Sequence, residues 1–377
     1  MLKGTFPVEK FKQLSTPFYY YDVKLLQDTL DVVKTESGKY GYHVHYAVKA
    51  NANPRILSII AANGLGADCV SGEVQAALDA GFPADKIVFA GVGKADWEIN
   101  LGLDNDIFCF NVESAVELEI INELAAAKNK VASIALRINP EVDAHTHAKI
   151  TTGMKENKFG INLSQLGGVL DKLKEMKNVK LIGIHSHIGS QITDMSSFRN
   201  LVIRFNEIQE ELEAHGVTVE NLNFGGGLGI DYYHPNHLSI PAFDNYFAAI
   251  HKLLQVRPGQ QVHFEPGRSI VAQCGTLISK VLYVKEGETK KFAILDAGFT
   301  ELIRPAMYDA YHRIENISSD EAVETYDVVG PICESSDVFG KDVELNKAHR
   351  GDLIALRSAS QYNCRHLPKA YYSDTIK

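Results

Sequence analysis

Six positions with side chains suited to catalysis or ligand binding follow stretches of sequence that are typical of β-strands. They are Lys49, Asp68, Arg137, His187, the glycine run 225–227 and Glu265. Each alone has an ordinary structural explanation, because lysines are mostly solvated and glycines often only bend a connection. Six positions of such varied chemistry, each at the end of a strand, instead indicate one site.

The elements that carry these residues are eight β-like runs separated by amphipathic or helix-rich segments. The runs are 43–48, 66–70, 87–90, 107–110, 131–138, 179–187, 221–224 and 261–265, and the main helical segments are 23–35, 54–63, 72–81, 113–128, 163–176, 196–215 and 241–255. This alternation predicts an α/β protein with a parallel (β/α)8 barrel. A doubly wound open sheet is the alternative, and the count of eight favours the barrel. Barrel enzymes carry their chemistry at the carboxyl ends of the strands.

The pattern changes after about residue 271, where β-rich runs follow one another without helical crossovers. These runs are 276–285, 291–295, 324–329 and 352–356. They predict a second, mostly antiparallel β domain, with which the β-like opening 16–22 could pair. We therefore expect a barrel over 22–270 and a β domain made of 1–21 and 271–377.

The ends of the seventh and eighth strands both suit a phosphate group. Gly225, Gly226 and Gly227 can offer backbone N–H groups to an anion, and Arg268 follows Glu265, Pro266 and Gly267 on the next strand. A phosphate cradle, a strand-end lysine and a carboxylate together suggest pyridoxal phosphate. We expect the cradle and the carboxylate to lie across the barrel from Lys49. Asp68 and Arg137 are expected to organise Lys49 and the cofactor, with His187 stacked on the cofactor ring.

Composition excludes several other classes of protein. The formal net charge is −9, which gives no general attraction to nucleic acid or to an anionic membrane. No apolar stretch approaches the roughly 18 residues of a transmembrane helix. Five scattered cysteines without CxxC pairs predict neither a disulfide framework nor a metal site, and a reducing cytoplasm fits them best.

Longer motifs resemble one enzyme family from about residue 16 to residue 368. They are YAVKAN (46–51), HSHIGSQI (185–192), GGGLGI (225–230), EPGRSIV (265–271), DAGFTELIRPAMYDAYH (296–312) and GPICESSDVF (330–339). Together they resemble the diaminopimelate decarboxylases, which are fold-type III enzymes related to alanine racemase and ornithine decarboxylase. The resemblance implies pyridoxal 5′-phosphate as cofactor and decarboxylation of meso-2,6-diaminopimelate to L-lysine, the last step of lysine biosynthesis.

The resemblance also implies roles for individual residues. Lys49 would be the Schiff-base lysine, His187 the ring-stacking residue and Cys333 the proton donor. The cofactor would contact Ser190, Gly225, Gly226, Gly227, Glu265, Gly267, Arg268 and Tyr362, with Glu265 at the ring nitrogen. The substrate would contact Arg268, Arg304, Tyr308, Glu334 and Tyr362. Cys333 and Glu334 would come from the second subunit, which implies a homodimer with composite active sites.

The segment between Ala359 and Tyr362 departs from the family pattern. About eight residues that the family usually carries there are absent, which weakens the assignment of Tyr362. The sequence leaves open whether this loop is shortened or was left out of the chain.

Other functions compete with this interpretation. A decarboxylase of another basic amino acid or polyamine precursor, such as ornithine, arginine or carboxynorspermidine, would not need Arg304 for a second carboxylate. An amino-acid racemase on the same fold faces the ring nitrogen with an arginine, against which Glu265 argues. A cofactor-binding homeostasis protein is a single barrel, and residues 271–377 count against it.

Overall fold

The structure is a computed structural model and describes residues 5–142, 158–360 and 370–372. The chain forms two compact units. One consists of 30–229 and 242–268, and the other of 1–29, 230–241 and 269–377. The division passes through helix α2 (Val23–Gly38). In the described part of the chain, no helix combines the length and the apolar character needed to cross a membrane.

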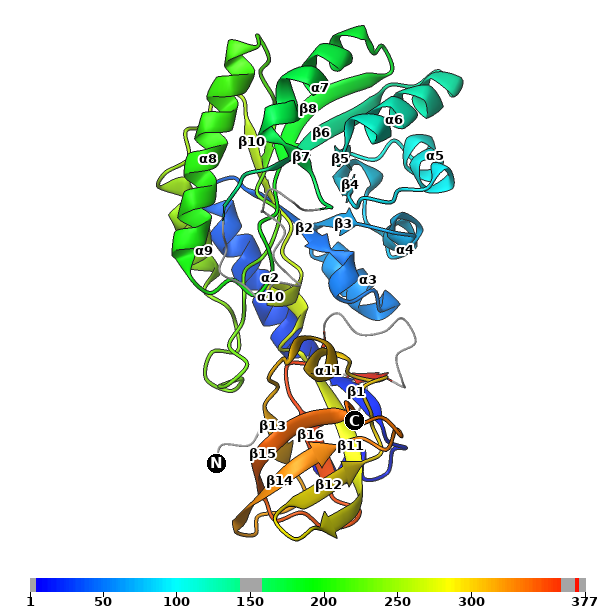
Figure 1. Ribbon diagram of the computed structural model, residues 1–377, viewed down its shortest axis with the longest axis vertical. Coiled ribbons are helices and arrows are strands. Elements are labelled where there is room, and N and C mark those ends of the chain that lie inside the picture. The colour runs from blue at the N-terminus through cyan, green and yellow to red at the C-terminus, as the bar shows by residue number, and fades with distance from the viewer. Residues whose placement is uncertain (1–4, 143–157, 361–369, 373–377) are drawn as a thin grey trace. The chain divides into compact units, whose positions relative to one another are not determined.

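The first unit is a closed barrel of eight parallel strands (Figure 1). Its strands are β2 (His43–Ala47), β3 (Gly66–Cys69), β4 (Ile87–Phe89), β5 (Cys109–Val112), β6 (Ala132–Asn139), β8 (Val179–His185), β9 (Asn221–Asn223) and β10 (Gln261–Phe264). They follow the order β5-β4-β3-β2-β10-β9-β8-β6, and β5 pairs with β6 to close the ring. A short strand, β7 (Ile161–Asn162), adds to β6. The predicted (β/α)8 barrel is confirmed. Six strands fall within their predicted runs, whereas β5 extends two residues and β6 one residue beyond the run predicted for it.

Helices surround the barrel strands, as Figure 1 shows for α3 to α8. They are α2, α3 (Pro54–Ala62), α4 (Glu73–Asp79), α5 (Asp96–Asp104), α6 (Ala115–Ala127), α7 (Leu163–Glu175), α8 (Met195–Ala214), α9 (Phe243–His251) and α10 (Arg268–Val271), with single 3-10 turns η1 (Val48–Ala50) and η2 (Ala84–Lys86). Helix α3 begins where the Asn53 side chain accepts the Arg55 N–H and Pro54 supplies a preset φ.

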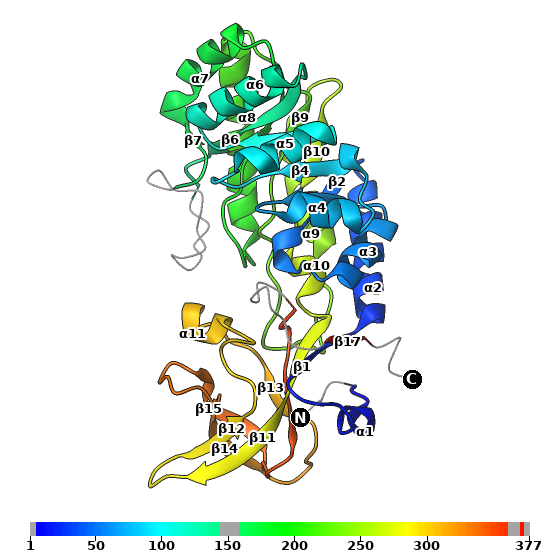
Figure 2. The same cartoon turned by 90° about the vertical axis from the view of Figure 1, so that its right-hand side faces the viewer.

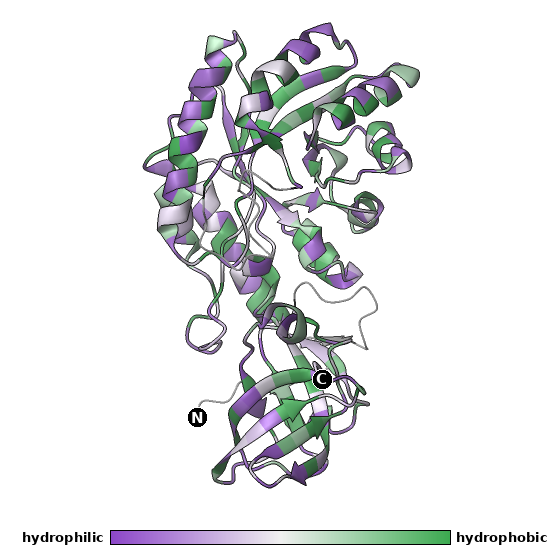
Figure 3. Cartoon of the chain, viewed as in Figure 1, coloured by the Kyte–Doolittle hydropathy of each residue, from purple (hydrophilic) through white to green (hydrophobic). Residues whose placement is uncertain are grey.

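Helix amphipathicity fixes which face of each helix packs on the barrel. Helix α8 carries both hydrophilic and hydrophobic stretches (Figure 3), and its buried side chains include Phe198, Leu201 and Phe205. Helix α5 was not predicted from the sequence. Its N-cap position is Ala95, which has no capping side chain, and the Glu98 carboxylate accepts the Ala95 N–H instead.

The second unit is built on one mostly antiparallel sheet, as predicted. Its strands are β1 (Phe18–Tyr21), β11 (Gly275–Glu286), β12 (Lys291–Leu295), β13 (Ile314–Asn316), β14 (Val323–Val329), β15 (Val338–Asn346), β16 (Leu353–Leu356) and β17 (Ala370–Tyr372), with short helices α1 (Val8–Phe11) and α11 (Arg304–Tyr308). The long strand β11, visible in Figure 2, pairs with β1, β12 and β16. Pairs β12–β14 and β1–β17 are parallel.

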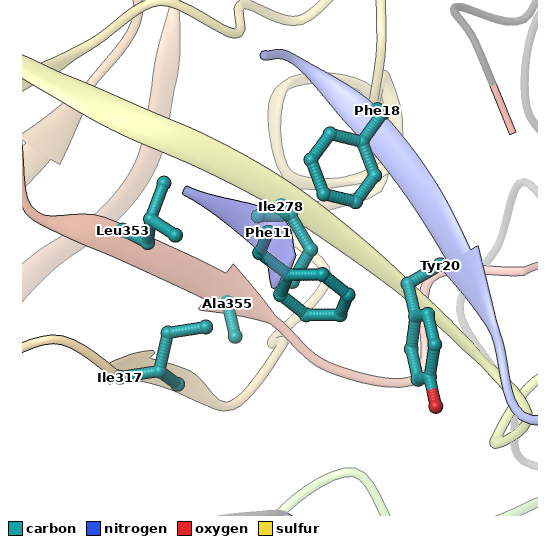
Figure 4. Packing of buried hydrophobic residues seen from close by; sticks show 7 residues of the cluster. All are labelled: Phe11, Phe18, Tyr20, Ile278, Ile317, Leu353 and Ala355. Carbon is teal, nitrogen blue, oxygen red and sulfur yellow. The ribbon is translucent and has the colours of Figure 1, made fainter. Parts of the chain in front are cut away.

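The N-terminal segment completes the core of this second unit. The ring of Phe11 lies 5.3 Å from that of Phe18 and 5.0 Å from that of Tyr20, measured between centroids. Figure 4 shows these rings beside Ile278 of β11 and the side chains of β16. Strand β1 pairs antiparallel with β11, so the expected pairing of the opening segment with the β domain is confirmed.

Candidate active site

The predicted barrel residues lie together at the carboxyl ends of the parallel strands. Lys49 lies in η1, directly after β2, and Asp68 lies in β3. The others lie at or just beyond the ends of β6, β8, β9 and β10, namely Arg137, His187, Ser190, Gly225, Gly226, Gly227, Glu265, Gly267 and Arg268. Because all eight strands are parallel, these positions share one rim of the barrel.

Lys49 faces a buried carboxylate. Its Nζ lies 3.5 Å from Oδ2 of Asp68, and the Lys49 side chain is 35% exposed whereas that of Asp68 is 1% exposed. The other oxygen of Asp68, Oδ1, is buried and has no hydrogen-bond partner among the described residues. Burial and the nearby carboxylate of Glu265 raise the pKa of Asp68, although Lys49 opposes the shift.

One expected placement around Lys49 is wrong. Strand β10 pairs directly with β2, through His263 with His43 and Phe264 with Val44. Glu265, at the end of β10, therefore lies on the strand next to that of Lys49 and not across the barrel from it. Because the barrel closes, its last strand along the chain, β10, becomes the neighbour of its first strand, β2.

Glu265 receives three side-chain hydrogen bonds inside the barrel. Its Oε2 lies 2.9 Å from Nε2 of His185, while its Oε1 accepts from Nδ2 of Asn223 at 2.6 Å and of Asn111 at 3.1 Å. Burial by itself would raise the pKa of Glu265, but the contact with His185 and the charge of Lys49 outweigh burial and hold that pKa below its ordinary value. Glu265 is therefore an ionised carboxylate that can pair with a cationic ligand group.

His187 is held as a neutral ring. Its Nδ1 accepts the backbone N–H of Gly226 at 3.2 Å, so the second ring nitrogen carries the proton. Burial and the nearby charges of Lys49 and Arg137 lower the pKa of His187 well below its ordinary value. A neutral imidazole held in this way suits contact with a flat ligand better than proton donation.

The glycine run packs tightly against its neighbours. A Cβ at Gly226 would lie 2.2 Å from the carbonyl oxygen of Glu265, which no side chain tolerates, and Gly227 has φ +111°. Two of the three N–H groups are already used, by Asn223 Oδ1 and by His187. Of the three N–H groups, only that of Gly227 has no acceptor among the described residues. One backbone amide, and not the expected three, is therefore available to bind a phosphate.

Ser190 and Arg268 complete this end of the site. Nη2 of Arg268 donates to Oγ of Ser190 at 3.0 Å. The Cβ of a residue replacing Gly267 would lie 3.0 Å from the Cβ atoms of Ala47 and Ala50, so the chain after β10 packs closely on the Lys49 turn. A guanidinium, a hydroxyl and an unused amide suit a phosphate.

Arg137 is already paired. Its Nη1 lies 2.6 Å from Oε1 of Glu113, and its guanidinium lies over the ring of Phe159 at 4.7 Å. Glu113 also accepts the N–H groups of Gly91 and Gly160. Arg137 and Glu113 therefore connect several loops of the rim. Glu113 also compensates most of the positive charge that Arg137 could offer a ligand.

Four polar residues of this site were not predicted from the sequence. They are Asn111, Glu113, His185 and Asn223. The sequence signal for these residues is the two-residue period of a strand, in which residues two positions apart point to the same side. His185 lies two positions before His187, and Asn223 lies two positions before Gly225. Asn111 and Glu113 are related in the same way at the end of β5. The period places each on the same side of its strand as a neighbour at the rim.

Three of the predicted substrate residues, Arg304, Tyr308 and Glu334, lie in the second unit. Arg304 is buried, donates from Nη1 to Nε2 of His312 at 2.8 Å, and stacks its guanidinium 4.9 Å from the ring centroid of Tyr232. Tyr308 ends the same short helix, α11, and is half-buried. Nδ1 of His312 is bonded to the carbonyl oxygen of Arg357, so His312 is a neutral acceptor toward Arg304.

Cys333 and Glu334 lie on an exposed loop of the second unit. The loop is shaped by Asp337, a buried carboxylate that accepts the N–H groups of Phe299 and Ile332 at 2.7 and 2.8 Å. Tyr362 and most of the segment with the expected shortening lie outside the described residues.

Comparison with known proteins gives consistent similarities. Residues 26–272 match the family described as pyridoxal-dependent decarboxylase, pyridoxal binding domain. A curated diaminopimelate decarboxylase of Bacteroides thetaiotaomicron is 65% identical over an alignment of 385 positions, which covers 100% of both chains. Another, from Haemophilus influenzae, is 42% identical and covers 94% of this chain and 86% of the relative.

Solved structures extend the similarity to the fold. A diaminopimelate decarboxylase of Helicobacter pylori, solved with L-lysine, superposes with a TM-score of 0.90 at 38% identity, covering 97% of this chain and 93% of that one. A lysine/ornithine decarboxylase of Vibrio vulnificus, solved with putrescine, reaches a TM-score of 0.82 at 22% identity, covers 97% and 96% of the two chains, and shares the fold.

Proposed function

The chain belongs to the pyridoxal-dependent decarboxylases, and on this premise we propose that it decarboxylates meso-2,6-diaminopimelate to L-lysine. It would thus be a pyridoxal-phosphate-dependent carboxy-lyase that performs the last step of lysine biosynthesis. The observation that carries this proposal is the 65% identity to a curated diaminopimelate decarboxylase over the full length of both chains.

The barrel rim has the groups that pyridoxal 5′-phosphate needs. Lys49 would hold the cofactor covalently, and Ser190, Gly227 and Arg268 would bind its phosphate. Ionised Glu265 would pair with the protonated ring nitrogen, and the neutral ring of His187 would lie against the cofactor face. When bound, the cofactor accepts the electron pair that the departing CO2 leaves behind. Gly225, Gly226 and Gly267 would allow the close backbone approach, while Asp68 and Arg137 would order the rim.

Residues of the second unit would bind the rest of the substrate. The end of diaminopimelate that does not react carries a carboxylate and an ammonium group. Arg304 suits that carboxylate, because a guanidinium can donate two parallel hydrogen bonds to it. Glu334 suits the ammonium group, and Tyr308 and Arg268 add polar contacts. Cys333 would return a proton to the carbon that lost CO2.

Two further parts of this proposal concern the oligomeric state and the cellular compartment of the enzyme. We expect a homodimer in which Cys333 and Glu334 act in the site of the partner subunit. We also expect the chain to work in a reducing cytoplasm, where cysteines stay free. The cysteines among the described residues are all free thiols, and Cys333 is exposed.

The direct test is a substrate assay. Purified protein loaded with pyridoxal phosphate should release CO2 and L-lysine from meso-diaminopimelate and should not turn over ornithine. Ornithine lacks the second carboxylate, so it could not accept the two parallel hydrogen bonds that Arg304 would donate. Equal turnover of both substrates would refute diaminopimelate as the specific substrate.

Arg304 should determine recognition of the second carboxylate. We expect Arg304→Gln to weaken L-lysine binding by about 2–5 kcal/mol, the range for removing one partner of a buried charged pair. Binding of cadaverine, which is lysine without that carboxylate, should change little. The measurement is calorimetric titration of both ligands into the loaded protein, with the exposed Arg350→Gln as control. An unchanged ratio of the two affinities would contradict the assignment.

A further inference from the structure

Glu265 is enclosed by donors that do not belong to the expected cofactor contacts. His185, Asn111 and Asn223 come from three different strands, β8, β5 and β9, and all three are buried. Their N–H groups reach both carboxylate oxygens, at 2.9 Å on Oε2 and at 3.1 and 2.6 Å on Oε1. Both oxygens of Glu265 are therefore held by buried donors.

The hydrogen-bond pattern shows which nitrogen of His185 is the donor. Its Nε2 lies 2.9 Å from Oε2 of Glu265, and an ionised carboxylate can only accept, so Nε2 carries the hydrogen between them. Its Nδ1 is buried and has no hydrogen-bond partner among the described residues. The hydrogen bond from His185 to Glu265 therefore stabilises the ionised form of this carboxylate.

A carboxylate beside a pyridine nitrogen can take the proton away from that nitrogen. The proton rests on the more basic of the two atoms, and each hydrogen bond donated to the ionised carboxylate makes the carboxylate less basic. Besides His185, the titratable groups that interact electrostatically with Glu265 in the described part of the chain are Lys49, Asp68, His45, Cys109, His187, Tyr246 and His263.

We infer that His185, Asn111 and Asn223 are positioning residues that keep Glu265 weakly basic, so that the proton shared with the cofactor stays on its ring nitrogen. This rests on the proposed function, since it requires bound pyridoxal phosphate. Asn223 has a second task, because its Oδ1 accepts the Gly225 N–H at 2.9 Å and so links Glu265 to the glycine run. His185 has no such second contact, which makes it the better residue to test.

The experiment compares two neutral replacements of His185. His185→Gln keeps a side-chain N–H that can reach Glu265, whereas His185→Leu removes the donor at similar volume. Each variant is loaded with pyridoxal phosphate labelled with 15N in the ring, and the 15N chemical shift reports whether that nitrogen is protonated. Buried Gln209→Leu, on helix α8 and remote from the rim, controls for loss of an internal amide.

We expect wild type, His185→Gln and Gln209→Leu to show a protonated ring nitrogen. His185→Leu should shift the ratio of protonated to neutral nitrogen at least about tenfold, which corresponds to one pKa unit. If His185→Leu does not fold, Asn111→Leu removes a donor from the other oxygen and should shift the ratio in the same direction.

Two outcomes would overturn the inference in distinguishable ways. A folded, loaded His185→Leu or Asn111→Leu with the wild-type 15N shift shows that the donors do not set the proton position, while the proposed function stands. A wild-type protein that binds no labelled pyridoxal phosphate removes the proposed function and this inference with it.

Discussion

Lys49→Ala is expected to remove both the visible absorbance of the bound cofactor and the decarboxylase activity. Lys49 lies in the turn directly after β2, beside the buried carboxylate of Asp68. In this position it would attach the cofactor covalently and move protons at the reacting end of the substrate. Loss of a positioned proton-transfer group alone costs about 10²–10⁴-fold in rate, and we expect at least that loss.

The measurement is the absorption spectrum of purified Lys49→Ala protein together with CO2 release. Lys252→Ala is the matched control, because Lys252 is exposed at the end of helix α9. The control should keep both the absorbance and the activity. A Lys49→Ala protein with the wild-type absorbance band would show that another group holds the cofactor.

Cys333→Ala is expected to lose activity by about 10²–10⁴-fold, the usual contribution of a general acid. Cys333 is exposed in this single chain, which fits a residue that acts in the site of a second copy. Mixed with inactive Lys49→Ala protein, it should regain about a quarter of wild-type activity. Random pairing in a symmetric dimer makes about half of the dimers mixed, and each of these has one intact site.

The mixing experiment needs a control for assembly. Ser335→Ala, on the same exposed loop, should keep full activity as a homodimer. Mixed dimers can be counted by giving the two variants different tags. If mixed dimers form and no activity returns, Cys333 acts in the site of its own subunit or outside catalysis.

Much of the barrel could be predicted because its signals are local. A run such as 87–90 is short, apolar and bounded by turn residues, and each helix between two runs has its own apolar face. Helix α5 was not predicted because its N-cap residue has no capping side chain. The N–H group at its start is instead bonded to the carboxylate of Glu98, which lies inside the helix. In the β domain, strands β13, β15 and β17 were not predicted. Strands β13 and β17 have only three residues each, and the alternation of β15 is interrupted by Gly340, Lys341 and Asp342.

The site was predicted in part for the same reason. Lys49, His187 and Glu265 end strands, and the end of a strand can be read along the chain. The partners of these residues could not be read in this way. Nothing near Glu265 in the sequence points to Asn111, which lies 154 positions earlier and donates to it. The expected position of Glu265 across the barrel from Lys49 was wrong, because it did not take into account that closure makes β10 the neighbour of β2.

The sequence by itself determined the eight strands, the rim on which the reactive residues lie, and the family of decarboxylases. These properties depend on residue type and spacing within single elements, or on motifs that are continuous in the chain. Only the tertiary structure decided which side chains surround Glu265, which amide of the glycine run remains unused, and that Arg137 is already paired with Glu113. Hydrogen bonds and desolvation act over a few ångströms in space, and barrel closure brings together groups that are far apart along the chain.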